Sequence, residues 1–214
     1  MIVRGVVLAV VVAACALLGT TAGAAPPVPD ASISGGDTSS GFLGECAMLT
    51  ERQQVRCYTR ELLDMVERSG DPASELPRID RRVHAAGGLI ESSCHVFMHE
   101  VGRTWAKRHR ITFGNIYRFV PRSNDPGCSA GFGMGLTMYL GPQLVAEPSH
   151  ALETCSRLPT RLREYTCIHG TGHALMRGYH GVLDYSVKVC RGLGAVAAPD
   201  CSQGAFHDYW ISLG

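Results

Sequence analysis

The sequence predicts an all-α protein built from stacked helical hairpins, an α-solenoid-like arrangement stapled by disulfide bonds. Three observations predict it. Segments that begin with cysteine recur every 34 to 39 residues, starting at residues 57, 94, 128, 167 and 201. Apolar residues between them follow helical spacing, and most cysteines lie in pairs 11 or 12 residues apart. Repeats of this length are typical of helical hairpins that bury their apolar faces only against their neighbours.

Residues 1–24 are predicted to be a secretory signal peptide. Arg4 precedes a run without charges from Gly5 to Leu18, and Ala22 and Ala24 have the spacing that a signal peptidase accepts. The run is shorter than the roughly 18 apolar residues of a membrane-spanning helix. We therefore expect a secreted or otherwise extracytoplasmic protein without a transmembrane helix in the mature chain.

An alternative for the leader is a lipoprotein signal. The residues "VAAC" from Val12 to Cys15 have the form of a lipoprotein box, in which Cys15 would be acylated and kept as a membrane anchor. This alternative changes where the protein is held and leaves the folded domain as it is.

Residues 25–41 are rich in proline, serine and glycine and lack a hydrophobic period, so they are expected to form a flexible tether. The folded domain is expected to cover residues 42–214. Without residues 1–24 the chain has 19 basic and 19 acidic residues. This balance argues against nucleic acid as a partner, because nucleic acid binding needs a concentrated positive surface. A protein or a small molecule is the expected partner.

Eight cysteines follow the signal peptide, and an even number in an exported chain favours disulfide bonds. Three close pairs are expected to join the end of one helix to the start of the next: Cys46 with Cys57, Cys155 with Cys167, and Cys190 with Cys201. Cys94 and Cys128 remain. Equivalent positions on stacked helices are about 8–10 Å apart, which is too far for a disulfide. Either the hairpins deviate there and the two cysteines pair, or both thiols stay free.

The repeated segments share a pattern around the later cysteines. The texts "CSAGFGMGL", "CIHGTGHAL" and "CSQGAFHDY" have glycine three residues after the cysteine and methionine or histidine six residues after it. In architecture this plan resembles secreted helical repeats of the Sel1 and tetratricopeptide kinds, although the consensus residues of those repeats are not present. The resemblance implies a fold and no function.

Local signals also predict helix ends. Apolar residues at helical spacing predict a helix from about Ile90 to Lys107. Thr160 can cap a helix that stops near Gly178, Gly192 can end another, and Pro199 can begin the last.

Two of the predicted helices carry the sequence His-x-x-x-His. The pairs are His95 with His99 and His169 with His173, and this spacing lets both rings of a pair reach one point in space. A helical wheel puts His169 and His173 at the centre of a buried face, with Thr171 outside it. Burying an imidazole without a hydrogen-bond partner is costly, so another polar group or a ligand must contact these two rings.

The repeat register brings in further residues. His173, His207 and Met134 all lie six residues after the cysteine of their repeat, and Glu100 has this position in a weaker copy. Equivalent positions in a helical stack line one surface, so these side chains are expected to share a groove.

Neutral imidazoles are common ligands of transition metals, and zinc or copper is the expected ion. The predicted ligands are His95, His99, His169, His173, His207 and Met134. Glu100 or Asp208 is the candidate general base if a bound ion activates water for hydrolysis. Neither H-E-x-x-H nor C-x-x-C-H occurs in the sequence.

The alternative function is a non-enzymatic extracellular binding scaffold whose buried histidines are structural. The sequence does not decide whether the protein is an enzyme. The ending "DYWISLG" leaves open an oligomer that forms through an apolar C-terminal face.

Overall fold

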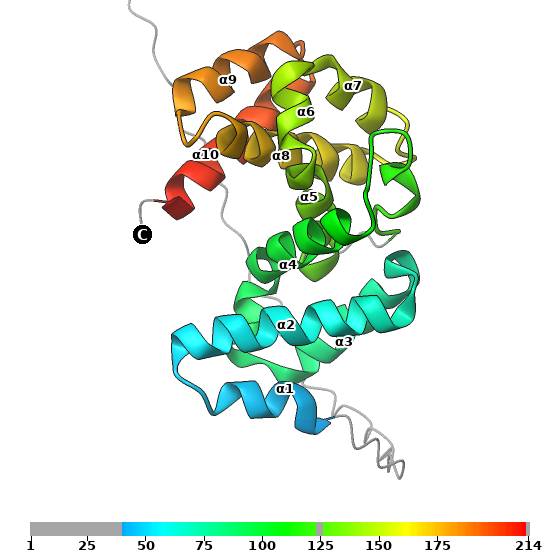
Figure 1. The fold of residues 1–214 in the computed structure, drawn as a ribbon, viewed down its shortest axis with the longest axis vertical. Coiled ribbons are helices and arrows are strands. Elements are labelled where there is room, and N and C mark those ends of the chain that lie inside the picture. The colour runs from blue at the N-terminus through cyan, green and yellow to red at the C-terminus, as the bar shows by residue number, and fades with distance from the viewer. Residues whose placement is uncertain (1–39, 123–125, 213–214) are drawn as a thin grey trace, which may run out of the picture. The chain divides into compact units, whose positions relative to one another are not determined.

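The computed structural model describes residues 40–122 and 126–212. This part of the chain forms ten α-helices and one short 3-10 helix, without a strand, which confirms the predicted all-α class (Figure 1). The elements are α1 (Ser40–Ala47), α2 (Glu51–Ser69), α3 (Pro72–Ala86), α4 (Gly88–Arg108), η1 (Ile116–Arg118), α5 (Cys128–Tyr139), α6 (Gly141–Ala146), α7 (Ser149–Cys155), α8 (Arg161–Gly178), α9 (Leu183–Gly192) and α10 (Ala197–Ser212).

The predicted signal peptide, the alternative anchor Cys15 and nearly all of the predicted tether lie outside the described residues. The first described helix begins at Ser40, two residues before the start predicted for the folded domain. Among the helices described, none combines the length and the apolar character that crossing a membrane requires.

All eight cysteines after residue 40 form disulfide bonds. The three close pairs join α1 to α2, α7 to α8 and α9 to α10, as their spacing predicted. Cys94 and Cys128 also pair, with their Cα atoms 5.1 Å apart, and this bond joins α4 to α5. The hairpins therefore deviate here from the ordinary spacing of stacked helices.

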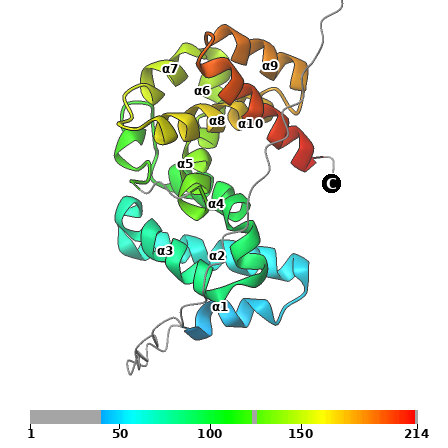
Figure 2. The ribbon, with the colours of Figure 1, turned by 180° about the vertical axis from the view of Figure 1, so that it is seen from behind.

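The helices that carry the repeated cysteines pack in sequence order. Helix α2 packs on α4, α4 on α5, α5 on α8, and α8 on α10, which lies across α8 when the molecule is seen from behind (Figure 2). The repeats are not uniform, because the described residues between α4 and α5 form the 3-10 helix η1 and no second α-helix of a hairpin. This leaves α5 in direct contact with both α4 and α8.

Glycine explains how two helix pairs approach so closely. A Cβ atom at Gly131 of α5 would overlap the carbonyl oxygen of His95 on α4, and a Cβ at Gly204 of α10 would overlap the carbonyl oxygen of His169 on α8. Both glycines are the residue three after the cysteine of their repeat. The repeated glycine thus brings the backbone of a histidine-bearing helix against its neighbour.

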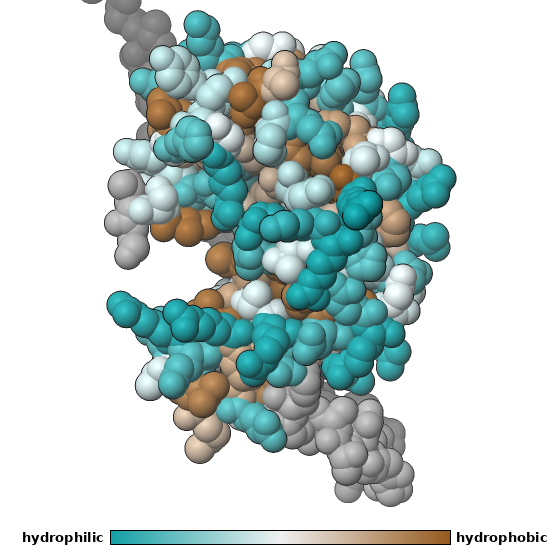
Figure 3. All heavy atoms as spheres, in the orientation of Figure 1, coloured by the Kyte–Doolittle hydropathy of each residue, from teal (hydrophilic) through white to brown (hydrophobic). Residues whose placement is uncertain are grey.

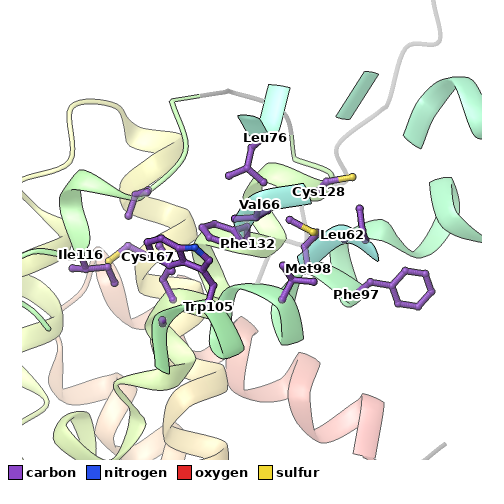
Figure 4. Close-up of a cluster of buried hydrophobic side chains, with 14 of the residues drawn as sticks. Leu62, Val66, Leu76, Phe97, Met98, Trp105, Ile116, Cys128, Phe132 and Cys167 are labelled. Atoms are coloured by element: carbon purple, nitrogen blue, oxygen red, sulfur yellow. The ribbon is translucent and has the colours of Figure 1, made fainter. Parts of the chain in front are cut away.

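The hydrophobic core runs along this series of helices. Trp105 of α4 lies against Phe132 of α5, with ring centroids 5.8 Å apart, and Figure 4 shows both in one buried cluster that also contains Ile116 of η1. Helix α8 is buried on all sides from Thr166 to Met176 because helices surround it. The expectation that Thr171 lies outside the buried face is therefore wrong, and its hydroxyl donates to the carbonyl of Cys167 at 3.1 Å.

Most predicted helix ends agree with the structure to within two residues. Helix α8 starts after Thr160, whose hydroxyl accepts a hydrogen bond from the backbone nitrogen of Arg163 at 3.3 Å, and it ends at Gly178. Helix α10 begins two residues before Pro199. Proline is tolerated in a first helical turn because the N–H groups there have no partner within the helix.

Candidate metal centre

Five histidines from three helices gather in one cluster. His95 and His99 come from α4, His169 and His173 from α8, and His207 from α10. The ring centroids of neighbouring pairs are 4.8 to 6.3 Å apart. The two His-x-x-x-His pairs meet where the ring of His99 lies 4.8 Å from that of His173. These are the five histidines that the sequence singled out as metal ligands.

Three members of this histidine cluster are close enough to share an ion. His169, His173 and His207 each offer a ring nitrogen, and these atoms all lie within 4.8 Å of one another. A tetrahedral zinc ion bound at 2.0–2.1 Å holds its nitrogen donors about 3.3 Å apart. The nitrogens of the three rings lie up to 4.8 Å apart, so the rings would have to move closer together to bind an ion with this geometry.

Backbone carbonyls fix the tautomer of His95. Its Nδ1 lies 2.9 Å from the carbonyl oxygen of Pro126 and 3.2 Å from that of Gly127. A carbonyl oxygen only accepts hydrogen bonds, so Nδ1 carries the proton and donates it. In a neutral His95 ring the lone pair is then on Nε2, the nitrogen that does not contact these carbonyls.

His173 also has a polar partner at Nδ1. Nδ1 of His173 lies 3.2 Å from Oδ1 of Asp208, and Nε of Arg177 lies 3.7 Å from the same carboxylate oxygen. A carboxylate that accepts from Nδ1–H orients an imidazole and leaves Nε2 as the ligand atom, which is the usual second shell of a histidine-bound metal.

His169 is oriented through a short chain of hydrogen bonds. Its Nδ1 lies 3.2 Å from the hydroxyl of Tyr165, which donates to Oε1 of Gln203 at 3.0 Å. Because the hydroxyl proton goes to Gln203, the hydroxyl oxygen accepts from Nδ1–H of His169. Burial raises the pKa of Tyr165, which keeps this hydroxyl protonated. In this arrangement His169 also has its lone pair on Nε2.

The Nε2 atoms of His99 and His173 are buried and have no hydrogen-bond partner among the described residues. The two side chains are nearly inaccessible, with His173 at 0% and His99 at 5% exposure. Buried polar atoms in folded proteins nearly always have partners, and an unpartnered one costs about 1–3 kcal/mol. The Nε2 atoms of these two rings are therefore free of other polar contacts and available to a ligand.

Burial keeps most of the histidine cluster neutral. Burial lowers the pKa of His99 well below its ordinary value and that of His169 to about 3, and neighbouring histidines add to both effects. Burial also lowers the pKa of His207, and that of His173 although Asp208 acts in the opposite direction. Neutral imidazoles have the free lone pair that a metal ion needs.

A cavity of about 730 Å³ opens beside the histidine cluster. His95, His169 and His207 form part of its wall, and Met134 of α5 lines the same space. The remaining lining residues are mostly apolar or aromatic: Pro126, Ala130, Leu162, Tyr165, Thr166, Gln203, Phe206, Tyr209 and Trp210. An ion held by the histidines would therefore be reachable from this cavity.

The two candidate bases occupy different surroundings. Asp208 contacts His173 and Arg177, as described above. Glu100 accepts hydrogen bonds from Arg103, at 2.6 and 3.0 Å, and from Thr104, and it does not line the cavity. Burial alone would raise the pKa of Glu100, but the hydrogen bond and charge of Arg103, together with Thr104 and the charge of Arg177, outweigh it and lower the pKa. The structure thus does not bring Glu100 to the histidines.

The reason for the position of Glu100 is a shift of register. In α8 the clustered histidines lie two and six residues after Cys167, whereas in α4 they lie one and five residues after Cys94. A shift of one residue turns a side chain by about 100° around the helix. It brings His99 to the cluster and carries Glu100 away.

The four remaining histidines lie outside the histidine cluster. His84, His109 and His150 contact carboxylates of Glu91, Glu67 and Glu147, respectively, and His180 follows the end of α8. The sequence alone did not predict the hydrogen-bond partners of the Nδ1 atoms of His95, His169 and His173. Tyr165 and Gln203 lie four residues before His169 and His207, a helical spacing that could have pointed to them, whereas nothing in the sequence indicates the carbonyl of Pro126.

Neither a protein-family model, nor a curated protein, nor a solved structure matches the chain.

Proposed function

We propose that this protein binds a transition metal ion through the histidine cluster. The observation that carries the proposal is the pair of buried, unpartnered Nε2 atoms of His99 and His173 inside a group of five imidazoles. His169, His173 and His207 are the proposed inner ligands, and His99 is the nearest further imidazole. Asp208, Tyr165 and the carbonyl of Pro126 are proposed to hold the rings by their Nδ1 atoms.

Zinc and copper suit the ligands best. Imidazole binds both ions well, and among divalent ions an all-nitrogen site has its highest affinity for copper. Met134 lines the adjoining cavity, and a thioether there favours copper further. Zinc would be favoured by the tetrahedral arrangement that three or four of the imidazoles can provide.

The proposed location is outside the cytoplasm. Four disulfide bonds within one chain are typical of exported proteins, because cytoplasmic thiols are kept reduced. This agrees with the signal peptide that the sequence predicts at residues 1–24. The lipoprotein anchor at Cys15 stays the alternative, and electrophoresis of protein labelled with a lipid precursor would distinguish the two.

Equilibrium dialysis of the oxidised protein against zinc or copper tests the proposal. We expect about one tightly bound ion per chain, counted by plasma mass spectrometry. Competition between the two ions in one dialysis would decide the preference. An absence of tight binding of either ion would support the alternative, a scaffold with structural histidines.

Acid should destabilise the metal-free protein. His169 has a pKa of about 3 in the folded protein and about 6.5 when unfolded, so between these values only the unfolded chain binds the proton. The free energy of unfolding should therefore be highest above pH 6.5 and fall as the pH falls, by up to about 1.4 kcal/mol per pH unit from His169 alone. Urea unfolding at pH 7.5 and pH 5.0 measures this. A stability that rises on acidification would contradict the neutral, buried state of the histidines.

Metal-dependent hydrolysis is the second candidate function, favoured by the cavity that reaches His95, His169 and His207. A bound ion with an open position lowers the pKa of a bound water and supplies hydroxide at neutral pH. Neither Glu100 nor Asp208 is among the described residues that line the cavity, so neither offers a general base there. Assays of the zinc-loaded protein with ester and amide substrates test this function, with the metal-free protein as the control.

A further inference from the structure

We infer that the cavity beside the histidine cluster binds a small, uncharged molecule with an apolar body and one lone-pair donor atom, which reaches the metal ion. This inference rests on the proposed metal site and names the class of ligand that the site would take. It depends on the size of the cavity, on the chemistry of its wall and on the residues at its mouth.

The cavity has the dimensions of a small-molecule site. Its volume of about 730 Å³ lies within the range of about 300–1,000 Å³ that is typical of ligand pockets. Its wall combines residues from α4, α5, α8 and α10, the same helices that position the histidine cluster and that glycines bring close together. Residues of four helices, together with Pro126, therefore form this wall.

The wall of this cavity disfavours a charged ligand. Among the described residues it includes no Asp, Glu, Lys or Arg, and its polar groups are the three imidazoles, the amide of Gln203 and the hydroxyls of Tyr165, Thr166 and Tyr209. Tyr165 and Gln203 already bond to each other and to His169. A charged ligand would lose its hydration without finding a counter-charge in this wall, so an uncharged one is favoured.

Aromatic side chains stand at the mouth of the cavity. Trp210 is 76% exposed and Phe206 is 53% exposed, although both are large and apolar. Figure 3 shows hydrophobic surface beside the C-terminal end of α10, the helix that carries them. Exposed apolar groups that border a cavity are typical of ligand-binding sites. They can cover an apolar body whose donor atom points inward to the histidines.

A cobalt-loaded protein and two related probes test the inference. Imidazole has the donor nitrogen alone, and 4-phenylimidazole adds an apolar ring to the same donor. We expect 4-phenylimidazole to change the visible absorption of bound Co²⁺ and to bind at least about tenfold more tightly than imidazole, because the phenyl ring is buried in the cavity. Trp210→Ala should remove most of this difference, and Ile211→Ala, a neighbouring exposed residue that does not line the cavity, should keep it.

The outcomes separate the two claims. If cobalt, zinc and copper all fail to bind, the proposed metal function fails. If cobalt binds but the two probes have equal affinities, or if 4-phenylimidazole binds the metal-free protein equally well, the metal function stands and the inference about the ligand is overturned. A dimer in sedimentation velocity that Trp210→Ala dissociates would also overturn it, because a second copy of the chain would then cover the mouth.

Discussion

Replacing His169 and His173 together with alanine should reduce the affinity for the metal by at least about 100-fold, because two of the three proposed inner ligands are lost and the loss of a second-shell partner alone costs 10 to 100-fold. Equilibrium dialysis with plasma mass spectrometry measures the effect. The helical content should stay close to that of the original protein in circular dichroism. The alanines remove volume from the core, but they also remove a buried Nε2 that has no partner.

A matched control is the double variant His84→Ala/His150→Ala, which removes two histidines that contact surface carboxylates. It should bind the metal as the original protein does. If the His169→Ala/His173→Ala protein keeps its metal, the histidine cluster is not the site. If it loses its helices even without metal, the histidines are structural and the scaffold alternative is supported.

Gly204→Ala should destabilise the protein by about 2–4 kcal/mol, because the new Cβ atom would overlap the carbonyl oxygen of His169 and force α10 away from α8. The shift would also carry His207 away from the two histidines of α8, so metal affinity should fall although no ligand has been removed. Urea unfolding of the oxidised, metal-free protein gives the stability, and dialysis gives the affinity.

Gly192→Ala is the matched control for this substitution. Gly192 ends α9, and a Cβ atom there would have no neighbour within 4 Å. Alanine favours the helix at such a position, so the control should be unchanged or up to about 1 kcal/mol more stable. Equal stabilities of the Gly204→Ala and Gly192→Ala proteins would show that the backbone of α10 at Gly204 does not lie against the carbonyl of His169 on α8.

Much of the fold could be predicted from the sequence because its signals are local. Helix caps such as Thr160 and cysteines 11 or 12 residues apart depend only on neighbouring residues, and the structure agrees with them. The pairing of Cys94 with Cys128 could not be decided. It depends on how closely α4 approaches α5, and this distance is set by contacts such as that of Gly131 with the backbone of His95.

The candidate site followed from the sequence in part. The His-x-x-x-His spacing and the repeat register together pointed to the five histidines that the structure gathers. The same register pointed to Glu100, which the structure does not bring to the cluster, because α4 is turned by one residue relative to the other repeats. The cavity, with Trp210 at its mouth, could not be predicted because residues from four helices form it.

X-ray absorption spectroscopy of the metal-loaded protein tests the central claim most directly, because it identifies the atoms bound to the ion. We expect three or four imidazole nitrogens at about 2.0–2.1 Å from zinc, with the multiple-scattering pattern of histidine rings. The His84→Ala/His150→Ala protein should give the same spectrum. A first shell of oxygen atoms alone, or of cysteine sulfur, would contradict the claim that the histidine cluster is a metal centre.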